Sequence, residues 1–239
     1  MRVEIWSDIV CPFCYIGKRR YEEALSQLGY RSEVETVYRS FELDPNAPVK
    51  ADRDLHDSLA AKFGISREQA KSMNDQVTEQ ARSVGLTYNL DQAMPTNTFD
   101  AHRLTHLAAK YGKMAEMTER LFKAYFTEGK HIGDRQVLAE LAAEIGLDPA
   151  EVGEALSRSS YSEEVRADEQ EAAQLGVRGV PFFVINRKYA VSGAQPTEVF
   201  IRALEKARSE EQPSITVVND EADAGAACTV ESCKPAARK

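Results

Sequence analysis

The chain has 239 residues, an apolar fraction of 43% and a formal net charge of -8 from 38 acidic and 30 basic residues. This length allows one sizeable domain or two small ones. The acidic balance lacks the positive surface that nucleic acids need, so DNA and RNA are not expected partners. No run approaches the roughly 18 to 20 apolar residues of a membrane span, and the start, Met1–Trp6, reads as a strand rather than a signal peptide. We therefore expect a cytoplasmic protein without a membrane partner.

The first forty residues have the pattern of a strand, a helix and a second strand. Residues 3–6 suit a strand, and residues 12–28 have helical character ended by Gly29. Residues 34–41 alternate with a period of two, as a half-buried strand does. This order predicts half of a small α/β sheet.

The character of the sequence changes at Asp44, and residues 44–175 are predicted to form an inserted all-helical domain. Ser66 and Gln69 have the spacing of a capping box, and Asp148 precedes a proline that suits the first turn of a helix. Glycines stand where predicted helices would end: Gly64, Gly85, Gly112, Gly129 and Gly146. Stripes of apolar residues at helical spacing are interpreted as core: Val137, Leu138, Leu141, Ala142 and Ile145, and Met114, Met117, Leu121 and Tyr125.

Strand character returns after a predicted helix over residues 161–175, which we expect to pack on the sheet. Residues 182–185 and 189–191 flank a turn, and a helix is predicted from about Thr197 to Ala207. The sequence beyond is rich in Glu, Ala, Ser and Asp and predicts a mobile tail. The predicted boundaries are therefore 1–43 and 176–208 for the two halves of the α/β domain, 44–175 for the insertion and 209–239 for the tail.

The four cysteines fall into two close pairs, Cys11 with Cys14 and Cys228 with Cys233. Paired cysteines in a reducing compartment usually form transient catalytic disulfides or metal sites. Cys11 lies where the first strand gives way to a helix, whose positive N-terminal end stabilises a thiolate. The spacing predicts that Cys11 is the nucleophile and that Cys14 resolves a mixed disulfide held on Cys11. Half of a zinc site, or two buried thiols, are the alternatives.

A second motif, Gly179-Val180-Pro181-Phe182, stands at the start of a predicted strand. Proline cannot donate to a strand ladder, so Pro181 fits the first position of the strand, which is a common setting for a cis peptide bond. An ordinary trans proline is the alternative, and the cysteine pair upstream favours the first interpretation.

The segment Ser7–Gly17 (SDIVCPFCYIG), the helical insertion and residues 176–184 together resemble the DsbA-like thioredoxin family, and its FrnE branch in particular, over about residues 1–208. The resemblance implies an α/β thioredoxin fold with a large inserted all-helical domain and a cis-proline loop that faces the CxxC, and the composition adds a flexible C-terminal tail to this fold. It also implies disulfide exchange on protein substrates, with Cys11 and Cys14 catalytic and Pro181 aligning the substrate. Further residues are expected to bind substrate or shape the site: Trp6, Asp8, Pro12, Phe13, Asn97, His102 and Val180.

Phe13 departs from the strongly oxidising relatives, which carry a histidine between the cysteines. An apolar neighbour adds no charge that would stabilise the Cys11 thiolate, and a stabilised reduced state is what makes a couple oxidising. The sequence therefore predicts reduction or isomerisation of protein disulfides rather than strong oxidation. Phe13 would also add to the exposed apolar surface that a chaperone activity needs.

Cys228 and Cys233 can form a disulfide only if the segment between them turns, because their Cα atoms must come within about 7 Å. The stretch of about 18 residues from Glu210 to Cys228 would span roughly 23 Å as a flexible chain. The tail is therefore predicted to reach Cys11 and exchange electrons with the first pair. Incidental thiols or a metal-binding tail are the alternatives.

No bound cofactor is predicted, and the expected electron partner is glutathione or a thioredoxin-type protein. The nearest alternative function is a glutathione-dependent isomerase or transferase of the same fold, which Cys14 disfavours because a resolving thiol would intercept mixed disulfides. A thiol-rich chaperone or metal-binding protein is a third hypothesis. His102 and His106 lie one helical turn apart without further ligands at a fitting spacing, so no metal site is predicted there.

Overall fold

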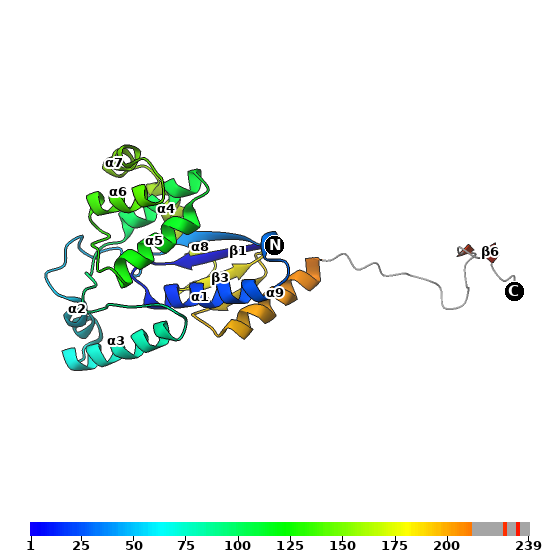
Figure 1. Cartoon of the computed structure of the whole chain (residues 1–239), viewed down its shortest axis with the longest axis horizontal. Helices are drawn as coiled ribbons and strands as arrows, with labels where there is room; N and C mark the ends of the chain where they lie inside the picture. Colours follow the sequence, from blue (N-terminus) through cyan, green and yellow to red (C-terminus); the bar gives the residue numbers. More distant parts are fainter. Residues whose placement is uncertain (212–226, 229–232, 235–239) are drawn as a thin grey trace.

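A four-stranded sheet forms the centre of the molecule, and each end of the described chain supplies two of its strands (Figure 1). β1 (Arg2–Ser7) runs parallel to β2 (Glu35–Ser40) and antiparallel to β3 (Phe182–Ile185), which pairs with β4 (Tyr189–Ser192). The strand order is β2-β1-β3-β4. The computed structural model describes residues 1–211, 227–228 and 233–234.

Helices cover both faces of this sheet. α1 (Pro12–Gln27) and α9 (Thr197–Glu211) pack on one face, where Val3 and Ile5 of β1 enter a common core with them. α8 (Ser162–Gln174) packs on the other face against Trp6. Since side chains alternate along a strand, β1 serves both cores. A short 3-10 helix, Arg31–Glu33, connects α1 to β2.

The helical insertion lies between β2 and β3 in the chain. The helices between these two strands are α2 (Leu55–Phe63), α3 (Arg67–Arg82), α4 (Phe99–Lys110), α5 (Met114–Phe126), α6 (Arg135–Glu144), α7 (Pro149–Ser157) and α8. Figure 1 shows α4 to α7 gathered together, with α2 and α3 forming a separate pair. In the part of the chain that the structure describes, none of the helices is long and apolar enough to cross a membrane.

The capping signals in the sequence predicted several helix ends correctly. The Ser66 hydroxyl accepts from the Gln69 backbone N–H while the Gln69 side chain accepts from the Ser66 N–H, which completes the capping box. Asp148 caps α7 by accepting from the Ala150 N–H. Gly64 ends α2 in the left-handed conformation (φ 65°), which glycine adopts without a steric cost. Local sequence thus fixes these boundaries.

The predicted end of the last helix is wrong by about one turn, because α9 continues to Glu211 rather than ending near Ala207. Two side-chain pairs hold the additional turn. Arg208 forms an ion pair with Glu33 at 2.8 Å, and the Glu210 carboxylate pairs with Lys188 in the turn before β4. The remainder of the predicted mobile tail lies outside the described residues, apart from β5 (Ala227–Cys228) and β6 (Cys233–Lys234), which pair with each other in antiparallel fashion.

The buried carboxylate of Asp168 joins α8 to the sheet and to the insertion. Its Oδ2 accepts from the Ser40 backbone N–H at 2.9 Å, and its Oδ1 accepts from Arg39 at 2.9 Å. His106 Nε2, from α4, lies 3.1 Å from Oδ2. The Trp6 indole N–H donates to the Asp168 carbonyl at 2.9 Å. Four elements therefore depend on one side chain and its backbone.

We expect the substitution Asp168→Ala to lower the free energy of unfolding by about 2–4 kcal/mol, because it leaves the buried Ser40 N–H without its acceptor and removes one of the two carboxylates that pair with Arg39. Urea denaturation would measure this loss. Asp75→Ala, which removes an exposed ion pair with Lys71, is the matched control and should change the stability little. Equal effects of the two substitutions would contradict the role given to Asp168.

Candidate functional site

Cys11 is the N-cap residue of α1, and Cys14 lies in the first turn of that helix. The Cys11 N–H donates to the Asp8 carbonyl at 3.1 Å, and the Cys14 N–H donates to the Cys11 carbonyl at 3.0 Å. Both cysteines are free thiols, with exposed fractions of 4% and 2%. The first N–H groups of a helix have no partner within it, so the Cys11 sulfur lies at the positive end of the helix dipole.

The environment of Cys14 disfavours its thiolate form. Burial raises the pKa of the Cys14 thiol well above its ordinary value, and hydrogen bonding and charge from Cys11 raise it further. The nearby Ser7 side chain and Asp8 backbone lower the pKa of Cys14 without overcoming the effect of burial. At neutral pH, Cys14 is therefore held as a neutral thiol behind Cys11.

The cis-proline loop that the resemblance implies is present and faces the cysteines. The Val180–Pro181 peptide bond is cis. The Cys11 thiol donates to the Val180 carbonyl at 3.5 Å, which brings the loop against the cysteine pair. Gly17 of α1 allows this approach, because a Cβ atom at that position would lie 3.0 Å from Pro181 Cγ and 3.4 Å from Ala194.

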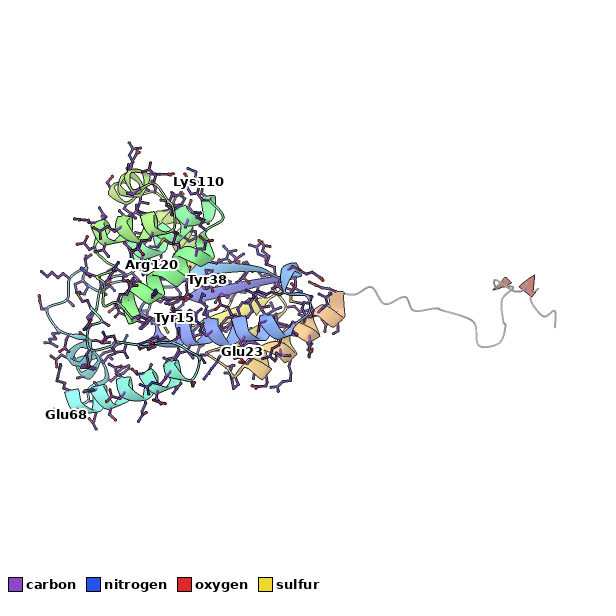
Figure 2. All side chains as sticks on the ribbon, in the orientation of Figure 1. Tyr15, Glu23, Tyr38, Glu68, Lys110 and Arg120 are labelled. Carbon is purple, nitrogen blue, oxygen red and sulfur yellow. The ribbon has the colours of Figure 1, made fainter. Side chains whose placement is uncertain are left out.

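The helical insertion also contacts α1. Tyr15, labelled in Figure 2, extends from α1 toward α5, the helix that carries Arg120. The Tyr15 hydroxyl donates to Glu119 at 2.6 Å, and its ring stacks on Phe122 with the ring centroids 4.9 Å apart. The Lys18 ammonium contacts the same carboxylate at 2.5 Å. The helix that bears the cysteines is therefore anchored to the insertion by both charge and packing.

The structure brings some of the expected site-shaping residues together and separates others. His102 Nε2, from α4, lies 3.3 Å from Asp8 Oδ1 in a buried pair just before the cysteines, and the Leu43 N–H donates to Asp8 Oδ2 at 2.8 Å. Phe13 is 39% exposed beside Cys11. Asp8 and His102 therefore lie next to the turn that carries the cysteines, and Phe13 forms its exposed side.

Trp6 and Asn97 have other contacts. Trp6 is fully buried beneath the sheet against α8. The Asn97 side chain accepts from the Phe99 N–H at the start of α4 and donates to the Pro45 carbonyl at 3.2 Å. His106 contacts Asp168, whereas His102 contacts Asp8. The two histidines therefore belong to separate polar clusters.

Sequence reasoning missed Tyr88 and Gly17. The Tyr88 hydroxyl donates to the Pro12 carbonyl at 2.7 Å, although Tyr88 belongs to the insertion and has no motif around it. Gly17 is part of the quoted segment, but its importance depends on how closely Pro181 approaches. Only the folded chain reveals either contact.

The chain belongs to the DSBA-like thioredoxin domain family, whose model matches residues 2–205. This membership makes it a thiol-disulfide oxidoreductase by family, as predicted. A probable DsbA oxidoreductase from Streptomyces coelicolor is 44% identical, with a TM-score of 0.85 and 98% of each chain covered. The uncharacterised protein YwbO of Bacillus subtilis is 31% identical over 214 residues, which cover 89% of this chain and 98% of the relative. The cytosolic disulfide reductase DsbM from Pseudomonas aeruginosa is similar in fold, with 20% identity, a TM-score of 0.59, and 88% and 100% of the two chains covered.

We expect Gly17→Ala to slow disulfide exchange by about tenfold, because the added methyl group would push α1 and the cis-proline loop apart and misplace the reacting sulfur. The initial rate of reduction of a protein disulfide would measure the effect. Gly153→Ala, in α7, is the matched control, since no atom lies within 4 Å of its added Cβ. It should keep the wild-type rate and gain stability. A wild-type rate for Gly17→Ala would contradict this prediction, because it would show that the loop can move away from α1 without slowing exchange.

Proposed function

We propose that this protein reduces or isomerises disulfides of protein substrates, with Cys11 as the nucleophile and Cys14 as the resolving thiol. The observation that carries the proposal is the position of Cys11, at the N-terminal end of α1 and in contact with the Val180 carbonyl. A substrate strand can align beside Pro181 while its sulfur meets the helix end. Cys14 lies one turn deeper as a neutral thiol, where it would react after Cys11.

The proposed reduction proceeds in two exchanges. The Cys11 thiolate attacks one sulfur of the substrate disulfide, a Cys11–substrate bond forms, and the other substrate sulfur leaves as a thiolate. Cys14 then loses its proton and attacks Cys11 Sγ, which forms the Cys11–Cys14 disulfide and releases the second substrate thiolate. The two electrons of the protein's dithiol have then passed to the substrate. In isomerisation, a substrate thiol attacks the mixed disulfide instead, and the dithiol is regenerated.

The surroundings of Cys11 favour reduction over strong oxidation. Phe13 supplies apolar surface to the turn and no charge, so stabilisation of the Cys11 thiolate rests on backbone dipoles. A couple whose reduced form is only moderately stabilised gives up its electrons more readily. This direction suits the reducing cytoplasm predicted from the sequence, with glutathione or a thioredoxin-type protein returning the electrons.

The tail pair is proposed as an electron relay for the first pair. Cys228 and Cys233 are direct partners in the antiparallel pairing of β5 and β6. Residues directly opposite each other in such a pair have Cα atoms about 4.5 to 5.5 Å apart, which falls within the range of disulfides. This register supports the turn that a disulfide between them requires.

The proposed function predicts a reduction potential nearer to the thioredoxin value of about -270 mV than to the DsbA value of about -120 mV. Equilibration of the Cys11/Cys14 pair in glutathione buffers would measure it, and Cys14→Ser should accumulate the mixed disulfide. A potential close to the DsbA value would reverse the proposed direction. Failure of the two cysteines to form a reversible disulfide would instead favour glutathione transfer or metal binding.

The relay predicts that the double variant Cys228→Ser/Cys233→Ser turns over substrate more slowly than the intact chain while keeping the same unfolding midpoint. The comparison should use limiting glutathione, where reloading of the first pair controls the rate. Adding excess reductant should restore the variant, because it bypasses the tail. Identical rates at limiting glutathione would refute the relay and leave the function of the first pair intact.

A further inference from the structure

The helical insertion places one hydroxyl group directly on the redox turn. Tyr88 lies in the segment 83–98, which has neither helix nor strand and connects α3 to α4. Its hydroxyl donates to the Pro12 carbonyl at 2.7 Å, and its side chain is almost fully buried in the core cluster that also contains Cys11 and Cys14. Pro12 separates Cys11 from Phe13, so this contact reaches the CxxC itself.

The phenol is held firmly in this position. The Tyr88 ring stacks on Phe126 with the centroids 4.6 Å apart and the planes at 20°. The neighbouring backbone is fixed on both sides, because the Asn89 N–H donates to the Phe126 carbonyl at 2.6 Å and the Thr127 hydroxyl donates to the Thr87 carbonyl at 2.7 Å. The hydroxyl is therefore preorganised before any substrate arrives.

The Pro12 carbonyl and the Phe13 N–H are the two ends of one peptide group. Phe13 occupies the second helical position of α1, so its N–H has no partner within the helix. The Cys11 thiol makes no cap hydrogen bond to it and donates to the Val180 carbonyl instead, so the N–H would act on the sulfur once Cys11 is a thiolate. A hydrogen bond received by a carbonyl polarises its peptide group and strengthens the N–H at the other end as a donor. The Tyr88 hydroxyl thus acts on the peptide group that directly follows Cys11 and Pro12 in the chain, and a more polar N–H at this helix end favours negative charge on the Cys11 sulfur.

The electrostatics of Tyr88 agree with this arrangement. Burial raises the pKa of Tyr88 far above its ordinary value, and the negative charge of Cys11 is the next largest cause. Tyr88 therefore remains a neutral donor at every physiological pH, and it lies within the electric field of the Cys11 sulfur.

We propose that Tyr88 is a positioning residue of the redox centre, which orients and polarises the Pro12–Phe13 peptide group that stabilises the Cys11 thiolate. This inference rests on the redox role of Cys11 proposed above. Through Tyr88, the insertion would then influence the reduction potential of the CxxC pair, because a more stable thiolate stabilises the reduced form.

The test is Tyr88→Phe in the full chain, which removes the hydroxyl and keeps the ring. Two measurements report on the Cys11 sulfur. One is the pH dependence of Cys11 alkylation, with the modified residue identified by mass spectrometry, and the other is the equilibrium constant between the Cys11–Cys14 disulfide and glutathione. We expect the alkylation midpoint to move to higher pH and the thiolate fraction near neutral pH to fall by about three- to tenfold. The Cys11–Cys14 disulfide should be favoured by a similar factor.

Tyr21→Phe is the matched control, because it removes the hydroxyl of another buried tyrosine. Tyr21 belongs to the core between α1, α9 and the sheet, where its hydroxyl lies 2.8 Å from Thr36 Oγ1. It should leave both readouts at their wild-type values. Thr127→Val loosens the segment that carries Tyr88 but keeps the hydroxyl, and it should shift both readouts in the same direction by a smaller factor.

The inference is overturned if Tyr88→Phe lowers thermal stability and leaves the alkylation profile and the glutathione equilibrium unchanged. If Tyr88→Phe does not fold, Thr127→Val decides, and wild-type readouts for that variant overturn the inference. Failure of the wild-type chain to form a reversible Cys11–Cys14 disulfide would instead contradict the proposed function, so the two failures are distinguishable.

Discussion

The central position of β1 in the sheet is the constraint on which the candidate site depends. β1 is hydrogen-bonded to β2 on one side and to β3 on the other, and the second of these pairings sets Trp6 opposite Phe182. Because β1 and β3 are antiparallel, the end of β1 lies beside the start of β3. The turn that follows β1 carries Cys11, and the loop that precedes β3 carries Pro181. Strand pairing alone therefore brings together two motifs that are far apart in the sequence.

The insertion adds contacts that converge on this junction from another direction. His102 reaches Asp8 just before the cysteines, Tyr88 reaches Pro12 between them, and Glu119 holds Tyr15 just after them. A bare βαβ unit would leave the N-terminal end of α1 facing solvent. Here the exposed fractions of both cysteines are a few per cent. The insertion therefore acts as one wall of the site, and its hydrophobic core includes both cysteines.

The sequence predicted those features that local chemistry determines. Caps such as Ser66 and Asp148, the helix end at Gly64, and the two motifs around Cys11 and Pro181 depend on residues close together in the chain, so pattern reasoning found them. Tyr88 and the Asp8–His102 pair depend on how an insertion of irregular path folds back on α1, which no spacing encodes. The additional turn of α9 was missed for the same reason, since its support comes from Glu33 and Lys188, which are distant in sequence.

The burial of Cys14 also bears on the chemical durability of the protein. Oxidation of sulfur by peroxide requires a thiolate that the oxidant can reach. A neutral thiol in the first turn of α1 offers the oxidant no negative charge, so oxidation would begin at Cys11. A sulfenic acid formed there would meet the intact Cys14 sulfur, and condensation to the disulfide would compete with irreversible oxidation. The arrangement that would delay the second thiol in the proposed exchange thus also preserves it as a means of repair.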